Sequence, residues 1–408
     1  MTPAASPAVP VTTPFACHPG FAATAGHLFE AARLLLPNLE QGRAIDAHAL
    51  RAAMEAAFGG SDAEGAWDWK SAYDAGEAAQ VLFLRKYGKA LFRKSGSPAA
   101  TLAMIEKVAA LLPTHTRRSE TSQALQQFST PAGLAFVASF AASIRPGDLV
   151  LEPSAGTGLL AVHAEAASGR LALNELGEIR AELLARLFDG AAVTRYDAAQ
   201  IHDYLDPGIL PSVVLMNPPF SAVAHVGTAM KDAALKHIAS ALARLAPGGR
   251  LVAITGAGCS PYAPAWAEAF AALQRKGRVI FSAAIDGRVY ARHGTTIDTR
   301  LTVIDRTPAA DPTVFPVSPG IAPDVTTLLD WVRDLVPPRD PTLAALGMAL
   351  PITSSRLVVA PRLRVPGIVA APATTSPSGP DVVELAYDTV DWTPAESGRL
   401  RPASASPA

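Results

Sequence analysis

The stretch VVLMNPPFSA (residues 213–222) places four residues of distinct chemistry directly after an apolar run. The side-chain oxygen of Asn217 and the carbonyl of Pro218 could accept hydrogen bonds from both hydrogens of a planar amino group. These acceptors would localise the nitrogen lone pair toward an incoming methyl group. Pro219 would hold the carbonyl rigid, and Phe220 would offer a face on which a flipped base stacks. The stretch predicts methyl transfer to a planar NH₂ group; the alternative is a rigid strand exit, because prolines cannot continue a ladder.

A glycine-rich turn lies upstream, in DLVLEPSAGTGLLAVHA (residues 148–164). A strand is expected to end at Glu152, the turn carries Gly156 and Gly158, and a helix follows. This order brings backbone N–H groups against a nucleotide-like ligand. A tight strand-to-helix turn that holds no ligand is the alternative.

Acidic side chains follow the next two expected strands. In RLALNEL the expected strand ends at Asn174 and Glu175 follows it, 17 residues after Gly158. An acid at this position is placed to accept bonds from both hydroxyls of a ribose. After the third strand, VTRYDAAQ offers Asp197 to an adenine amino group. Either acid could instead cap a helix.

Seven apolar runs between residues 116 and 306 alternate with amphipathic helical stretches. The expected strands are DLVLE, RLALN, AVTRY, SVVLM, GRLVAIT, RVIFSAAI and TRLTVID. The pattern predicts an α/β fold with a seven-stranded Rossmann-like sheet whose strands are buried on both faces. NPPF would follow the fourth strand, where the strand order of such a sheet reverses and a ligand crevice opens.

The flanking segments differ in composition. Residues 1–20 are expected to be disordered, and residues 21–115 are rich in Ala and Leu at helical spacing, which predicts a helical domain. Residues 307–408 contain 17 of the 35 prolines. They predict a Pro-rich linker or tail with one helix at DVTTLLDWVRDLV.

Composition limits the possible partners. The 408 residues carry a formal net charge of −1, so no global charge attracts nucleic acid or membrane. The two cysteines, Cys17 and Cys259, allow no disulfide framework and lack metal-ligand spacing, so no metal is expected. No apolar run reaches the roughly 18 residues of a membrane span, and the N-terminus has no signal pattern. A soluble, cytoplasmic protein is expected.

The motifs EPSAGTG, NE, YDAA and NPPF, in this order, resemble those of class I S-adenosylmethionine-dependent methyltransferases that modify amino nitrogens. Upstream, QQFSTP is similar to the cofactor-side segment of adenine-N6 DNA methyltransferases, including modification subunits of restriction systems. Its Thr130 and Pro131 also fit a helix N-cap followed by proline in the first turn. The resemblance implies catalysis by NPPF and S-adenosylmethionine binding by Thr130, Pro131, Glu152, Pro153, Gly156, Thr157, Gly158, Asn174, Glu175, Asp197, Ala198 and Asn217.

A wider run, about residues 115 to 395, is similar to the methylase module that precedes the helicase in bacterial strawberry-notch-like methylase-helicase proteins. RRSETSQALQQFSTP, IDGRVYARHGTTIDTRLTVIDR and VVELAYDTVDWTP carry this similarity. It implies DNA, and a helicase domain or subunit, as partners. The sequence contains no G-x-x-x-x-G-K-[ST] loop and no evident target-recognition domain.

The substrate class stays open between adenine N6 in DNA, which QQFSTP favours, and guanine N2 in ribosomal RNA or protein glutamine. A catalytically idle module of a helicase system is a further alternative. Two basic segments are candidates for phosphate contacts. The first, LRKYGKALFRK, is alternatively a solvated helix face, and the second, RHGTTIDTR, is alternatively a hairpin turn at Gly294. The candidate side chains are Arg85, Lys86, Lys89, Arg93, Lys94, Arg292 and His293.

Overall fold

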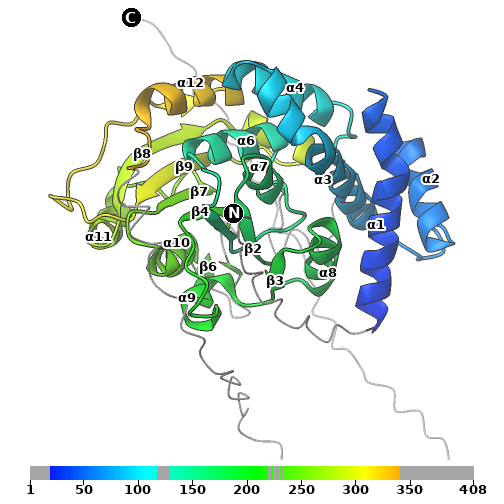
Figure 1. The fold of residues 1–408 in the computed structure, drawn as a ribbon, viewed down its shortest axis with the longest axis horizontal. Coiled ribbons are helices and arrows are strands. Elements are labelled where there is room, and N and C mark those ends of the chain that lie inside the picture. The colour runs from blue at the N-terminus through cyan, green and yellow to red at the C-terminus, as the bar shows by residue number, and fades with distance from the viewer. Residues whose placement is uncertain (1–18, 117–128, 219–221, 224–228, 231–232, 341–408) are drawn as a thin grey trace, which may run out of the picture. The chain divides into compact units, whose positions relative to one another are not determined.

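A mixed sheet of eight strands lies at the centre of the chain (Figure 1), in the order β10-β8-β9-β7-β4-β1-β2-β3. The computed structural model describes residues 19–116, 129–218, 222–223, 229–230 and 233–340. The strands are β1 (Leu149–Glu152), β2 (Arg170–Asn174), β3 (Ala192–Thr194), β4 (Val213–Met216), β7 (Arg250–Gly256), β8 (Arg278–Ile285), β9 (Thr299–Asp305) and β10 (Ile321–Ala322).

Seven of these strands occupy the predicted apolar runs, and β10 is an eighth. The expected strand number was therefore wrong. Strand β10 has two residues and pairs in parallel with β8 at the edge of the sheet, so it carries no alternation that a sequence pattern could reveal. Strand β9 runs antiparallel to both of its neighbours, β7 and β8. The other paired strands of this sheet are parallel, with β1 between β4 and β2.

Two hydrophobic cores lie on the two faces of the sheet, because successive side chains of a strand point to opposite faces. In β4, for example, Val213 and Leu215 belong to one core, and Val214 and Met216 belong to the other. The first core includes α6 (Ala132–Ala141), α7 (Ala161–Ala166), α8 (Glu178–Leu187) and α12 (Val325–Leu335). The second includes α9 (Ile201–Tyr204), α10 (Ala233–Arg244) and α11 (Ala267–Gln274), which Figure 1 shows on the opposite side.

Residues 19–109 form four helices, α1 (Pro19–Glu40), α2 (Ala47–Phe58), α3 (Trp69–Lys94) and α4 (Pro98–Ala109). The side chains of Asp46, Asp68 and Ser97 cap the last three of these helices at their N-termini. Helix α1 packs on α3 and α8, α3 packs on α7, and α4 packs on α6 (Figure 1). The N-terminal helices therefore form a further layer on these helices and contribute buried side chains to the first core.

The packed chain continues beyond Arg306, the boundary that the sequence predicted. Strand β10 extends the sheet, and α12, which starts after its cap Asp324, packs on α6 and β8. The predicted helix at residues 324–336 is thus present, but it belongs to the core. The rest of the Pro-rich segment, residues 341–408, lies outside the described residues, as do residues 1–18 of the predicted disordered N-terminus.

Short elements complete the described chain: the antiparallel pair β5 (Ala222–Val223) and β6 (Ala229–Met230), and the 3-10 helices η1 (Ala198–Gln200), η2 (Pro264–Trp266) and η3 (Gly287–His293). None of the helices within the described ranges is long and apolar enough to cross a membrane.

Candidate functional site

The candidate site lies where the carboxyl ends of β1, β2 and β4 meet. Strand β1 pairs with both β2 and β4, so the chain order reverses at β1. Ligands of open α/β sheets bind at such a switch point. Glu152 ends β1, Asn174 ends β2 and is followed by Glu175, and Asn217 follows β4.

Within the described part of the chain, the amide of Asn217 has hydrogen-bond partners at its nitrogen and none at its oxygen. Its Nδ2 donates to Oγ1 of Thr130 at 2.9 Å and to the hydroxyl of Tyr290 at 3.5 Å. Among the described residues, nothing donates a hydrogen bond to its buried Oδ1. Burial raises the pKa of Tyr290, which keeps that residue a neutral hydroxyl. The oxygen predicted to accept from an amino group is therefore oriented and unpartnered. Of the other motif residues, Pro218 is buried, while Pro219 and Phe220 lie outside the described residues.

Thr130 serves Asn217 and does not cap a helix. The residue preceding α6 is Pro131, and no side chain caps that helix. The N-cap alternative for Thr130 is wrong, because its hydroxyl is turned toward the end of β4. Tyr290, the second partner of Asn217, was not predicted; it lies in η3, far from NPPF in the sequence.

The glycine-rich turn takes the backbone shape that its glycines permit. Gly156 and Gly158 have φ of +56° and +87°, in the left-handed region that favours glycine. A Cβ on Gly158 would lie 2.3 Å from Cε2 of Phe188, so this glycine is needed for packing against the end of α8. A Cβ on Gly156 would meet only the guanidinium of Arg180, at 4.0 Å. The turn is thus tight beside Gly158 and more open beside Gly156.

The two carboxylates of the site differ in their partners. Oε2 of Glu175 accepts from the N–H of Gly156 at 2.9 Å, and Oε1 accepts from the N–H of Gly177 at 2.8 Å. An ionised carboxylate accepts about four hydrogen bonds, so about two positions remain for a ligand. Glu152 is buried, and its Oε2 is unpartnered within the described chain. Burial, together with the nearby charge of Glu175, raises the pKa of Glu152 well above its usual range.

Asn174 joins strand ends and has no capacity left for a ligand. Its Nδ2 donates to the carbonyls of Pro153 and Tyr196, and its Oδ1 accepts from Oγ1 of Thr194 and from the N–H of Tyr196. These four bonds use both donors and both lone pairs of the amide. Bonds within the protein thus occupy the side chain of Asn174, which was predicted to bind the cofactor, and the carbonyl of Pro153 belongs to the same network.

Asp197 takes the alternative role of a helix cap. Its Oδ1 accepts from the N–H of Ala199 at 2.9 Å, at the start of η1, and Ala198 is buried within that turn. The hydroxyl of Thr157, predicted to contact the cofactor, donates to Oε2 of Glu77 at 2.9 Å.

Glu77 is a site residue that sequence reasoning missed. It comes from α3, is buried, and accepts at Oε2 from the hydroxyls of both Ser129 and Thr157. One carboxylate of the N-terminal helices thus bridges the glycine-rich turn and the segment that carries Thr130. Helical spacing places Glu77 on α3, but no local sequence pattern indicates that its partner is Thr157, 80 residues away.

The first basic segment contains one half-buried basic side chain, Arg85, and four exposed ones, which include Lys86. Arg85 forms two bonds of 2.7 Å with Glu165 of α7, and its guanidinium lies 5.0 Å from the ring centroid of Phe188. Lys86 pairs with Glu40 of α1 at 2.7 Å. These two basic residues, predicted to contact phosphates, join helices through carboxylates of the same chain. Lys89, Arg93 and Lys94 are exposed.

The second basic segment, residues 292–300, starts with the last two residues of η3, Arg292 and His293, turns at Gly294 and leads into β9. Gly294 ends η3 with φ of +77°. Arg292, predicted to contact phosphates, donates to the carbonyls of Ala110 and Leu112 after α4. His293 faces Glu77, with 3.8 Å between its Nδ1 and Oε1.

No protein-family model and no curated protein matches the chain. Among solved structures it is similar to TrmN from Thermus thermophilus, with 21% identity and a TM-score of 0.33 over 46% of this chain and 52% of that one. A modification subunit of a putative type I restriction enzyme from Vibrio vulnificus has 16% identity and a TM-score of 0.37 over 50% of each chain. A putative class I S-adenosylmethionine-dependent methyltransferase from Listeria monocytogenes has 12% identity and a TM-score of 0.41 over 81% of this chain and 98% of that one. The chain thus spans about half the length of the first two.

Proposed function

We propose that this chain is an S-adenosylmethionine-dependent methyltransferase that acts on an exocyclic amino group, with adenine N6 in DNA as the favoured substrate. The observation that carries the proposal is the side-chain oxygen of Asn217. It is buried, unpartnered among the described residues, and oriented by two bonds to its own amide nitrogen. A buried acceptor in this state is costly unless a ligand supplies the donor.

The residues present fit S-adenosylmethionine. Two acceptor positions on Glu175 match the two hydroxyls of its ribose, and the carboxyl of Glu152 offers an unpartnered oxygen to its ammonium group. The left-handed Gly156 lets the backbone approach a ligand closely, because it carries no Cβ. When bound, this cofactor supplies an electrophilic methyl group.

The chain's own contribution is to activate and hold the acceptor amine. An exocyclic amine is a weak nucleophile because its lone pair is delocalised into the π system. Oδ1 of Asn217 would accept one amine hydrogen and shift electron density to nitrogen, and the carbonyl of Pro218 is proposed to accept the other. Thr130 and Tyr290 fix the amide before the substrate arrives, and preorganised groups act most strongly where charge develops in the transition state.

The nucleic-acid part of the proposal rests on a smaller basic surface than the sequence suggested. Three exposed cations near the C-terminal end of α3, Lys89, Arg93 and Lys94, can contact phosphates. Phe220 is proposed to stack on the flipped base. The motif QQFSTP supports adenine over guanine or glutamine, and the resemblance to methylase-helicase proteins supports coupling to a helicase.

The proposal is tested by methyl transfer from radiolabelled S-adenosylmethionine with the full chain. Unmethylated duplex DNA, ribosomal RNA and a glutamine-containing release-factor peptide are offered separately, and the labelled product is digested and identified. We expect N6-methyladenine from DNA only. Label in RNA or peptide would identify that molecule, and not DNA, as the substrate. Cofactor binding without transfer to any of the three would indicate a catalytically idle module.

A further inference from the structure

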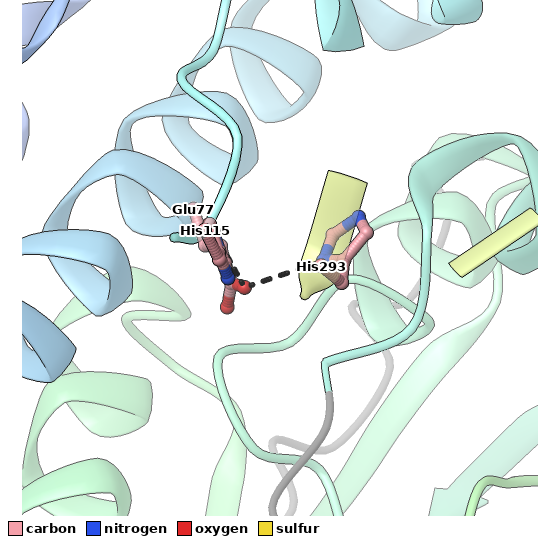
Figure 2. A group of neighbouring side chains, drawn as sticks. All are labelled: Glu77, His115 and His293. Atoms are coloured by element: carbon pink, nitrogen blue, oxygen red, sulfur yellow. Dashed lines mark ion pairs between the residues drawn. The ribbon is translucent and has the colours of Figure 1, made fainter. Parts of the chain in front are cut away.

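Three potential metal ligands meet beside the candidate site, from parts of the chain that are distant in sequence. They are Glu77 of α3, His115 in the segment after α4, and His293 at the end of η3 (Figure 2). Their ligand atoms all lie within 4.8 Å of one another. Oε1 of Glu77 is 3.9 Å from Nε2 of His115 and 3.8 Å from Nδ1 of His293. One carboxylate oxygen thus faces two imidazole nitrogens.

The side chains of Glu77 and His115 are held in place by their surroundings. Glu77 uses Oε2 for the hydroxyls of Ser129 and Thr157, which leaves Oε1 toward the histidines. His115 stacks on Tyr73, with ring centroids 4.2 Å apart and planes at 15°. Its backbone N–H donates to the carbonyl of Arg292, so the two histidine segments are tied together. Groups that support a ligand in this way orient it toward an ion and strengthen binding.

His293 offers a nitrogen that the described residues leave without a hydrogen bond. Its Nδ1 is buried, and at 3.8 Å from Oε1 of Glu77 it is beyond hydrogen-bond distance. A simple Glu–His ion pair would bring one imidazole N–H to about 2.8 Å from the carboxylate. Here the facing nitrogens of both imidazoles are about 1 Å further from the same carboxylate oxygen. This arrangement resembles three ligands around a single metal ion more than an ion pair.

We propose that Glu77, His115 and His293 bind a divalent transition-metal ion, with zinc the best match. Zinc binds imidazole nitrogen and carboxylate oxygen at about 2.0 to 2.2 Å, so tetrahedral ligand atoms lie about 3.4 Å apart. The two separations from Oε1 of Glu77, 3.8 and 3.9 Å, exceed this value by a few tenths of an ångström, and all three ligand atoms lie within 4.8 Å of one another, so the imidazoles would have to move inward to close around an ion. Two histidines and one carboxylate are a ligand set typical of zinc with an open fourth position.

The fourth position would open into a cavity of about 340 Å³ that all three ligands line. The other lining residues include Tyr73, Glu106 and Arg292. A cavity of this size and polarity has room for water or a small oxygen ligand on the ion. The site would tie the N-terminal helices to η3, and Glu77 would connect it to the glycine-rich turn through Thr157.

The sequence predicted no metal, because neither cysteine has ligand spacing and the three ligands are scattered over more than 200 residues. The proposal is independent of the methyltransferase proposal, since binding of the ion is measured without any methyl acceptor or cofactor.

The test uses the full chain, stripped of metal with a chelator and dialysed. Zinc is titrated by calorimetry, bound metal is counted by elemental analysis, and Co²⁺ is added as a spectroscopic probe. We expect one zinc per chain and a visible Co²⁺ spectrum of low coordination number. His293→Ala should lower zinc affinity about 100-fold or more, since it removes one of three ligands. His48→Ala, which removes an exposed histidine of α2, should match the parent.

A parent chain that takes up no zinc would overturn the proposal, and so would a His293→Ala chain with parental stoichiometry and affinity. Circular dichroism establishes whether the variant is folded. If it is not, the parent's Co²⁺ spectrum decides, because an octahedral, water-like spectrum is incompatible with three protein ligands and one open position.

Discussion

Two asparagines lie at the carboxyl ends of β2 and β4, the strands on either side of β1, and their side chains differ in hydrogen bonding. Asn174, after β2, has all four hydrogen-bonding positions of its amide satisfied inside the protein. Asn217, after β4, has its nitrogen held by Thr130 and Tyr290 and its oxygen unpartnered among the described residues. Both side chains are fixed, but of the two only Asn217 has an acceptor oxygen, Oδ1, that the described residues leave without a hydrogen bond. Asn174 should therefore matter for stability, and Asn217 for chemistry.

The largest expected effect comes from Asn217→Ala and falls on the rate of methyl transfer. Its oxygen is proposed to act as the amine becomes nucleophilic, so the loss should appear in the chemical step more than in binding. Single-turnover transfer should slow about 10²- to 10³-fold, the scale for one preorganised polar group. Cofactor affinity and the urea midpoint should stay near those of the parent. Asn38→Ala, in α1, is the matched control. If Asn217→Ala transferred methyl at the parental rate, NPPF would serve only to end strand β4 and not for catalysis.

Asn174→Ala should have the opposite profile. It leaves the carbonyls of Pro153 and Tyr196 and the N–H of Tyr196 without their partner in a buried network. We expect the free energy of unfolding to fall by about 3 kcal/mol, as several buried polar groups lose a bond. Urea unfolding followed by circular dichroism measures this. If Asn174→Ala were fully stable but could not bind cofactor, the contrast between the two asparagines would be reversed.

The carboxylates extend the comparison to the cofactor. Glu175 keeps about two acceptor positions, whereas Asp197 caps η1. Glu175→Ala should weaken S-adenosylmethionine binding by about 1.5 to 3 kcal/mol, the range for hydrogen bonds to a charged group. Asp197→Ala should change it by less than about 1 kcal/mol, because its main loss is a cap. Calorimetric titration of both variants decides, and equal losses would place Asp197 in the cofactor site as well.

Sequence reasoning succeeded where the signal was local. The seven long strands and the glycine-rich turn each follow from a short run of residues, and the switch point follows from their order. It failed where a side chain's partner is remote: Thr130 bonds to Asn217 across 87 positions, and Arg85 reaches Glu165 across 80. The partners of Arg85, Lys86 and Arg292, which are carboxylates and carbonyls, are likewise not evident in the sequence. The two asparagines were indistinguishable for the same reason.

A buried atom without a hydrogen-bond partner need not belong to a ligand site, and His163 is an example whose effect is expected on stability alone. Its Nε2 is also unpartnered within the described chain, and burial among aromatic rings lowers its pKa to about 4. The unfolded chain, with a histidine pKa near 6.5, takes up a proton at higher pH than the folded chain. The contribution of His163 to the free energy of unfolding is therefore fully present above about pH 6.5 and falls as the pH drops toward 4.

Between pH 7 and 5 the titration of His163 should lower the free energy of unfolding by about 2 kcal/mol. Urea titrations of the parent and His163→Phe at both pH values should show that difference; equal losses would mean that His163 does not titrate differently on unfolding.

The smallest expected effects separate the two partners of the Asn217 nitrogen. Thr130 accepts at 2.9 Å, an ordinary hydrogen bond, whereas the Tyr290 hydroxyl is at 3.5 Å, the outer limit of one. Thr130→Val keeps the side-chain shape and removes the acceptor, so the amide loses its main restraint. We expect single-turnover transfer to slow about 5- to 10-fold, which corresponds to a net hydrogen bond of about 1 kcal/mol. Tyr290→Phe keeps the buried ring and should slow transfer only about twofold. Cofactor affinity should stay parental in both, because neither change touches Glu152 or Glu175. If Thr130→Val instead weakened cofactor binding and left the rate unchanged, Thr130 would be a cofactor residue, as its motif implied, and the orientation of Asn217 would rest on Tyr290.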